Sequence, residues 1–169
     1  MKKLTLICMA IIATMFFGSC RGPQGPVGPA GNANVASSTV TAYPDDWEWD
    51  GISWRLDLDY PAINLDIHDF GAVIVYMNDR NTWRQIPLTF YYSLPNEDGS
   101  ESFYSSSLEV SSYQGGVSIF WTENDFADVG APDTHKFKIV AIASYLYNDR
   151  QDVDYSNYEA VKTVFQLTD

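Results

Sequence analysis

The sequence predicts an all-β fold, an antiparallel β-sandwich of about seven strands with a short C-terminal helix. Three observations predict it. Aromatic residues make up 15% of the 169 residues, and large flat side chains favour strands. Several segments alternate apolar and polar residues with a period of two, and clusters of turn-forming residues separate them. A hydrophobic fraction of 46% and a charged fraction of 19% are typical of a globular domain, which we place at residues 39–169.

Residues 1–19 have the zones of a lipoprotein signal peptide. Two lysines precede the apolar run Leu4–Phe17, which is too short to cross a bilayer as a helix. Two small residues then precede Cys20, whose thiol can accept a diacylglycerol. We therefore expect cleavage before Cys20 and lipid attachment at Cys20. The alternative is an ordinary secretory signal with an incidental cysteine.

Residues 20–38 contain the lipidated cysteine and an expected spacer. Glycine recurs at every third position through residues 22–31, and proline follows the first three glycines, as in collagen. A trimeric triple helix is one interpretation, but three triplets offer few interchain hydrogen bonds to offset the entropy of ordering three chains. We expect a monomer with an extended spacer, in which the triplet segment spans about 30 Å.

The motif Phe17-Gly18-Ser19-Cys20 resembles a lipobox, the cleavage signal of bacterial lipoproteins. With the triplets that follow, it resembles a group of small, largely uncharacterised lipoproteins of Bacteroidota-type bacteria. The segment ending at Leu88 (HDFGAVIVYMNDRNTWRQIPL) and the ending Tyr158–Leu167 (YEAVKTVFQL) are similar to the same group. The resemblance implies a β-sandwich, anchored by lipid in the outer membrane or cell envelope, with no assigned activity.

The resemblance leaves open which side of the outer membrane the domain faces. In some of these bacteria an acidic patch soon after the lipidated cysteine directs the protein to the cell surface. Here no acidic residue follows Cys20 until Asp45. Periplasmic and surface-exposed locations are therefore both possible.

The first half of the domain contains three predicted strands and a turn. Val35–Ala42 forms the first strand. Apolar and polar residues alternate through Ile52–Leu58, which predicts a half-buried strand. Ala72–Met77 is continuously apolar, which indicates a strand covered on both faces. Residues 78–81 have the composition of a turn.

The second half continues the alternation. Ile86–Tyr92 predicts a strand in which Pro87 marks a free edge or a bulge, because proline cannot donate to a ladder. Tyr104–Val110 and Val117–Trp121 flank a glycine turn and predict a hairpin. Phe137–Ala143 begins the last clear strand.

Two short helices are also predicted. Apolar residues at positions 63, 67 and 70 indicate one or two helical turns before the apolar strand. Residues 156–159 fit a capping box in which Ser156 caps the helix that follows. We expect this second helix to close one end of the sandwich. Its apolar stripe comprises Tyr158, Val161 and Phe165.

Charge and cysteine content exclude several classes of function. A net charge of −12 disfavours nucleic acid and anionic surfaces, so we expect no nucleic-acid partner. Cys8 lies in the signal peptide, and Cys20 is the expected site of lipidation. The folded domain then holds no thiol for a disulfide, a cysteine-ligated zinc ion or a cysteine nucleophile.

Few residues indicate a catalytic or metal site, and we assign no catalytic residue and expect no cofactor. His68 and His135 could share a metal with nearby acids, but nothing in the sequence brings them together. Asp149, Asp152 and Asp154 could bind Ca²⁺ or form a solvated turn. Whether the domain binds a metal is therefore left open.

The tryptophans offer a weak indication of ligand binding. Trp47 and Trp49 lie among acidic and turn residues, and together with Trp83 they could expose indole rings that stack on sugars. The competing interpretation is that these rings pack at the edge of the sandwich, since tryptophan is usually well buried.

These observations support three hypotheses of function. The first is a non-enzymatic envelope lipoprotein whose sandwich binds an envelope protein or glycan, or supports envelope structure. The alternative is a glycan-binding module that uses exposed tryptophans. A hydrolase with a carboxylate pair is a third hypothesis.

Overall fold

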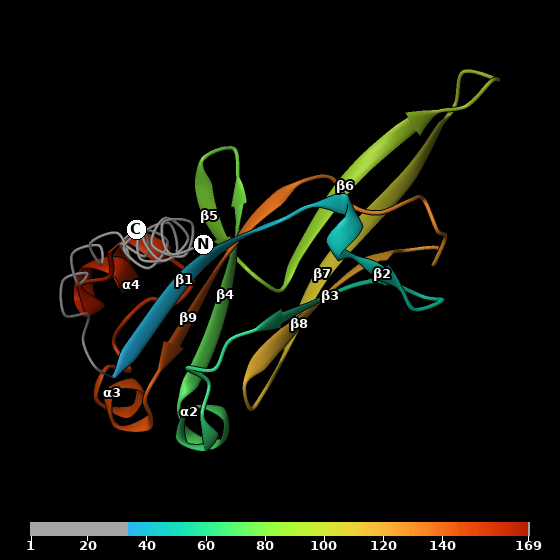
Figure 1. Cartoon of the computed structure of the whole chain (residues 1–169). Coiled ribbons are helices and arrows are strands. Elements are labelled where there is room, and N and C mark those ends of the chain that lie inside the picture. Colours follow the sequence, from blue (N-terminus) through green and yellow to red (C-terminus); the bar gives the residue numbers. More distant parts are fainter. Residues whose placement is uncertain (1–33, 169) are drawn as a thin grey trace, which may run out of the picture. The chain divides into compact units, whose positions relative to one another are not determined.

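The computed structural model describes residues 34–168, which form two antiparallel sheets with a few short helices, as the sequence predicts (Figure 1). One sheet has the strand order β1-β9-β4-β5, and the other has the order β2-β3-β8-β7-β6. The signal peptide, Cys20 and the Gly-Pro-x triplets lie outside the described residues. The domain boundary expected after residue 38 falls inside the first strand.

The described residues contain nine strands, two more than the approximate number predicted. The strands are β1 (Val35–Ala42), β2 (Glu48–Trp49), β3 (Trp54–Asp59), β4 (Ala72–Asp79), β5 (Thr82–Gln85), β6 (Leu88–Pro95), β7 (Glu101–Tyr113), β8 (Gly116–Glu123) and β9 (His135–Ile142). The helical elements are the 3-10 turn η2 (Pro44–Asp46) and the helices α2 (Leu65–Phe70), α3 (Ser144–Asp149) and α4 (Tyr158–Phe165).

The main core lies between the two sheets. Alternate side chains of β4 and β9 point into it from one sheet, among them Val75, Phe137 and Ile139. Leu108 and Ile119 meet them from the other sheet. The period-two pattern of the sequence therefore corresponds to the inner faces of the sandwich.

A second core covers the outer face of the four-stranded sheet. Ile74 and Tyr76 of β4 and Val140 of β9 point away from the first core and pack against α4 (Figure 1). The prediction that Ala72–Met77 is covered on both faces is thus confirmed. The expectation that the C-terminal helix closes one end of the sandwich is wrong, because α4 lies on a sheet face. The buried stripe of α4 is the predicted one, Tyr158, Val161 and Phe165.

The cap of α4 is shifted by one residue from the prediction. Asn157, and not Ser156, is the N-cap, and its side-chain oxygen accepts hydrogen bonds from the backbone N–H groups of Glu159 and Ala160. Ser156 instead donates its hydroxyl proton to the carboxylate of Asp154. The Asp154 carboxylate thus holds the Ser156 side chain within the preceding turn.

Two apolar residues assigned to the buried faces of predicted elements are exposed in the structure. Ile52 is 58% exposed, because the carboxylate of Asp50 accepts hydrogen bonds from the backbone of Ile52 and Ser53 and turns the chain there. Strand β3 therefore starts at Trp54. Phe70, at the end of α2, is also exposed.

The chain changes sheets at Ile86-Pro87. Ile86 still donates its backbone N–H to Val75 of the four-stranded sheet, whereas β6 begins at Leu88 in the other sheet. The single strand predicted from Ile86 to Tyr92 is thus divided between two sheets. The expectation of a free edge is confirmed, since β6 is an edge strand.

Lys138 is a buried cation on the outer face of β9. Its Nζ donates to the hydroxyl of Tyr158 at 2.8 Å and lies 4.5 Å and 4.9 Å from the ring centroids of Tyr158 and Trp83. An aromatic enclosure of this kind offsets part of the cost of removing an ammonium group from water. The ammonium group therefore couples α4 to the sheet.

We expect Tyr158→Phe to lower the free energy of unfolding by about 2 kcal/mol, because a buried ammonium loses an acceptor. In a Lys138→Met background, Tyr158→Phe should lower the free energy of unfolding by clearly less, since the methionine thioether needs no hydrogen-bond acceptor. Urea unfolding of the four proteins of this double-mutant cycle measures the coupling between the two side chains. A coupling energy of zero would contradict the assignment of the hydroxyl as the acceptor for Lys138.

Candidate functional site

The hairpin of β6 and β7 extends beyond the rest of its sheet. Strand β8 pairs with β7 only as far as Glu123, which lies opposite Ser106. Beyond a last pair of hydrogen bonds between Ser105 and Asn124, residues 101–104 of β7 pair with β6 alone. The result is a two-stranded ribbon that projects from the sandwich (Figure 1).

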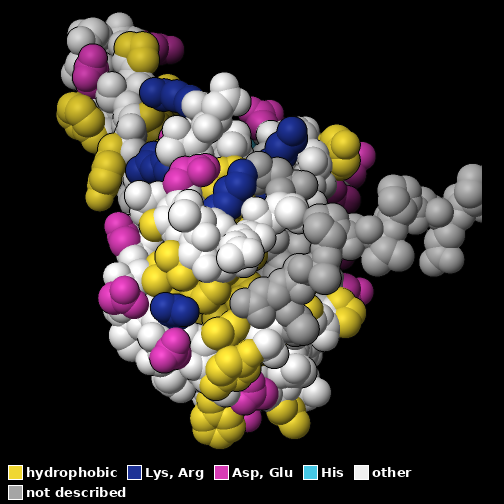
Figure 2. All heavy atoms as spheres, turned by 90° about the vertical axis from the view of Figure 1, so that its left-hand side faces the viewer, with side chains coloured by type: hydrophobic (Ala, Val, Ile, Leu, Met, Phe, Trp, Pro, Cys, Tyr) yellow, Lys and Arg dark blue, Asp and Glu magenta, His cyan; other side chains and the backbone are white. Residues whose placement is uncertain are grey.

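Aromatic rings are exposed on the outer face of this ribbon. Tyr91 is 84% exposed and Phe103 is 76% exposed. Tyr91 lies opposite Ser105 and Phe103 lies opposite Ser93, so the two rings are diagonal neighbours on one face. Hydrophobic side chains of the projecting part are visible in Figure 2.

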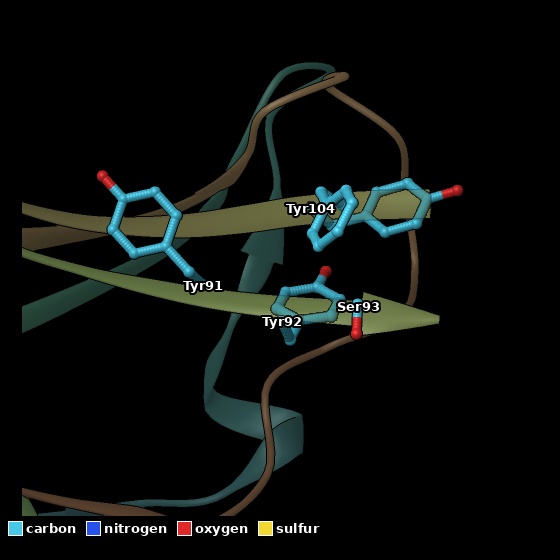
Figure 3. A pocket seen from close by; sticks show the side chains of 5 residues that line it. Tyr91, Tyr92, Ser93 and Tyr104 are labelled. Atoms are coloured by element: carbon cyan, nitrogen blue, oxygen red, sulfur yellow. The ribbon is translucent and has the colours of Figure 1, made fainter. Parts of the chain in front are cut away.

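The inner face of the ribbon is also aromatic. Tyr92 and Tyr104 form a direct cross-strand pair whose rings stack with centroids 5.7 Å apart (Figure 3). A shallow hollow of about 280 Å³ lies among the side chains of the two faces. Its lining residues are Tyr91, Tyr92, Ser93, Phe103 and Tyr104.

A buried carboxylate holds the base of the ribbon. Glu123 accepts hydrogen bonds from the Tyr92 hydroxyl at 2.6 Å, the Ser106 hydroxyl at 2.8 Å and the Trp121 indole at 3.3 Å. The bond to Glu123 raises the pKa of Tyr92 above its ordinary value. The stability contributed by this bond is therefore complete below the ordinary tyrosine pKa and is lost as the pH rises through the folded-state value.

A cleft lies beside this carboxylate, under the segment that joins β8 to β9. The rings of His135 and Trp121 stack there with centroids 5.0 Å apart. Trp121 also contacts Trp47 and Phe90. Burial lowers the pKa of His135, which keeps the ring neutral at pH 7. The rings that line this cleft pack mainly against one another. The cleft is lined by Trp54, Trp121, Glu123, residues 129–133 and His135.

The three tryptophans singled out from the sequence lie apart from the projecting hairpin. Trp47 is only 4% exposed and packs against Trp121 and Phe137, so its proposed role in stacking on a sugar is wrong. Trp49 is partly exposed and contacts Trp54. Trp83 is partly buried against Tyr158 of α4. The packing interpretation therefore holds for Trp47.

The other candidate groups do not assemble into a site. His135 lies at the start of β9. His68 lies in α2, shortly before the start of β4, and that end of β4 pairs with Ile142 at the other end of β9. The two histidines therefore lie toward opposite ends of β9. Across residues 34–168, no group of three or more His, Cys, Asp and Glu side chains is placed to hold a metal ion. Asp149 belongs to α3, and the carboxylate of Asp154 accepts a hydrogen bond from the hydroxyl of Ser156.

Sequence reasoning missed Tyr91 and Phe103. The adjacent tyrosines at positions 91 and 92 did carry a signal, because neighbouring residues of a strand point to opposite faces. One of the two rings therefore had to leave the core face.

Within residues 34–168, no helix is long and apolar enough to cross a membrane. The chain matches no family model, no curated protein and no solved structure. The resemblance to envelope lipoproteins therefore stays a prediction from the sequence.

Proposed function

We propose that the chain is a lipid-anchored protein of the cell envelope, attached through Cys20, whose sandwich binds a partner without catalysing a reaction. The exposed aromatic pair Tyr91 and Phe103 on the projecting hairpin carries the binding part of this proposal. Exposed aromatic rings on a rigid scaffold are typical of recognition surfaces. The anchoring part is supported by the signal-like segment before Cys20.

The chemistry of strand β6 favours an uncharged partner surface, whereas the acids Glu97, Asp98 and Glu101 lie at the tip of the hairpin. Strand β6 contains no charged residue, although the whole chain has a net charge of −12. The hydroxyl-bearing residues Ser93, Ser105 and Ser107 share the outer face with the aromatic rings. Rings and hydroxyls together suit either an apolar protein surface or the face of a sugar ring.

The binding part is tested with a photoreactive benzoylphenylalanine in place of Phe103 in the full-length protein in intact cells. We expect a discrete adduct with an envelope component other than the chain itself, and at least ten-fold less of it when Tyr91→Ser is added. The same probe in place of Tyr145, an exposed residue of α3, serves as the control. Equal adducts at both positions, or none at Phe103, would contradict binding by the hairpin.

The anchoring part is tested by mass spectrometry of the membrane-associated protein and its Cys20→Ala variant. A mature chain that begins at Cys20 and carries added acyl mass, absent from the variant, supports the anchor. An unmodified Cys20 would overturn it.

A glycan is a second candidate partner, favoured because Tyr91 and Phe103 expose ring surface on one face. Affinity electrophoresis through gels that contain soluble neutral polysaccharides distinguishes this case. Retardation of the wild type, lost in Tyr91→Ser/Phe103→Ser and kept in the control Phe70→Ser/Tyr145→Ser, would identify a glycan as the partner. Equal mobility of all three proteins would remove the glycan candidate.

A further inference from the structure

Strand β6 is a free edge with few of the features that usually protect one. It pairs with β7 on one side, and within residues 34–168 no strand pairs with its other side. It is eight residues long and contains no charged side chain. Exposed, uncharged edge strands readily pair with another chain.

The other sheet edges differ from β6. Strand β2 has only two residues and includes Glu48. Strand β5 has four residues and includes Arg84. Strand β1 is eight residues long but carries only small side chains. Only β6, among these edges, combines length with large apolar side chains.

The sequence around β6 is a palindrome of chemical types centred on Tyr91. Residues 87–95 are Pro-Leu-Thr-Phe-Tyr-Tyr-Ser-Leu-Pro. Proline, leucine, a β-hydroxyl residue and an aromatic residue follow in the same order from either end. An antiparallel pair of identical strands related by a two-fold axis requires this kind of self-complementarity.

We propose that two copies of the chain associate through β6, antiparallel, with Tyr91 opposite Tyr91 of the second copy. Residue i of one copy then lies opposite residue 182 − i of the other. Because the two numbers are both even or both odd, inner-face residues lie opposite inner-face residues. The two five-stranded sheets become one continuous sheet. The prolines at both ends of the palindrome end the paired segment, because proline cannot donate to the ladder.

This register covers apolar surface that one copy leaves exposed. On the inner face, Leu94, which is 52% exposed, lies opposite Leu88 of the second copy. Tyr92, which is 37% exposed, lies opposite Phe90 of the second copy. On the outer face, Thr89 lies opposite Ser93, a pairing of hydroxyl groups. Each cross-strand pair is therefore matched in chemistry.

Charge does not select β6 by itself. Two chains with a net charge of −12 repel each other over most approaches. Strand β6 adds nothing to this repulsion because it carries no charged residue, and the same holds for the edge strand β1. The large apolar side chains and the self-complementary sequence of β6 therefore favour it over β1.

The test compares two charge variants of the mature full-length protein, purified in detergent and measured by sedimentation equilibrium. Thr89→Glu/Ser93→Glu places like charges opposite each other at both Thr89–Ser93 contacts, and we expect the dimer dissociation constant to rise about ten-fold or more. Thr89→Lys/Ser93→Glu introduces as many charged groups at the same positions but places opposite charges together. This variant is expected to dimerise at least as tightly as the wild type.

Gln114→Glu/Gln151→Glu adds two acids at exposed positions away from β6 and controls for net charge. It is expected to dimerise like the wild type. A wild type that is monomeric at all concentrations would overturn the proposal. So would a dimer that withstands Thr89→Glu/Ser93→Glu, or one that Thr89→Lys/Ser93→Glu disrupts equally. All these variants keep Tyr91 and Phe103, so the outcome is independent of the binding role assigned to those rings.

Discussion

The Trp47→Ala variant is expected to lose about 4 kcal/mol of unfolding free energy, the largest effect that we predict for a single side chain. The indole fills the space between the two sheets, with its ring centroid 6.4 Å from that of Trp121 and 6.1 Å from that of Phe137. Truncation to alanine removes these contacts and leaves a cavity in a rigid sandwich.

Urea or guanidinium unfolding followed by circular dichroism measures this loss. Trp49→Ala is the matched control, two residues away in the same segment. Because Trp49 is partly exposed and contacts chiefly Trp54, we expect it to cost about 1–2 kcal/mol. Equal losses for the two variants would contradict the assignment of Trp47 as the buried ring of the pair.

The contrast between the two tryptophans shows where local pattern is insufficient. Trp47 and Trp49 occupy alternate positions among acidic residues, so the sequence treats them alike. In the structure η2 precedes Trp47, and the carboxylate of Asp46 accepts a hydrogen bond from the backbone N–H of Tyr43. Burial then depends on Trp121 and Phe137, which are distant in the chain. No local window contains that information.

Strong local patterns predicted β4 and α4 correctly. The continuous apolar run of β4 demanded cover on both faces, and the stripe of α4 provides cover for one of them. The residues of α4 do not indicate which surface the helix covers. The helix was therefore expected at the end of the sandwich. The apolar outer side chains of β9, Val140 and Ile142, were an available signal, because they need a second layer as well.

The exposure of the hairpin could not be predicted for a related reason. The alternation of Leu88, Phe90 and Tyr92 indicates a strand with an apolar inner face. Nothing near those residues indicates that β8 stops at Glu123 and leaves the end of the ribbon unsupported. The length of one strand thus determines the exposure of residues in another.

Glu123→Ala is expected to lower the free energy of unfolding by about 3 kcal/mol, because it leaves the buried Ser106 hydroxyl and two less buried donors without an acceptor. Glu123 and Ser106 are both buried, and the Ser106 hydroxyl donates to both carboxylate oxygens, at 2.8 Å and 3.0 Å. Tyr92 and Trp121 lose the same acceptor. The stability of Glu123→Gln should fall between those of the wild type and Glu123→Ala. The amide keeps one acceptor oxygen, but its NH₂ group replaces the other and faces donors.

Glu109→Ala is the matched control, since Glu109 is an exposed acid on the neighbouring strand β7. We expect it to change stability by no more than about 0.5 kcal/mol. Denaturant unfolding compares the two variants. A loss from Glu123→Ala that is no larger than that from Glu109→Ala would contradict the role of the carboxylate as the acceptor for the three donors.

Two further measurements separate this hydrogen-bonded group from simple loss of volume. In Glu123→Ala the pKa of Tyr92 should fall back toward the ordinary tyrosine value, because the hydrogen bond to the carboxylate is the largest cause of its elevation. Amide hydrogen exchange across residues 91–105 should also accelerate, because the Tyr92–Glu123 bond ties the projecting ribbon to β8. Faster exchange confined to the ribbon would show that Glu123 holds the aromatic hairpin in its orientation. Uniform acceleration across both sheets would instead assign the residue to the global stability of the sandwich.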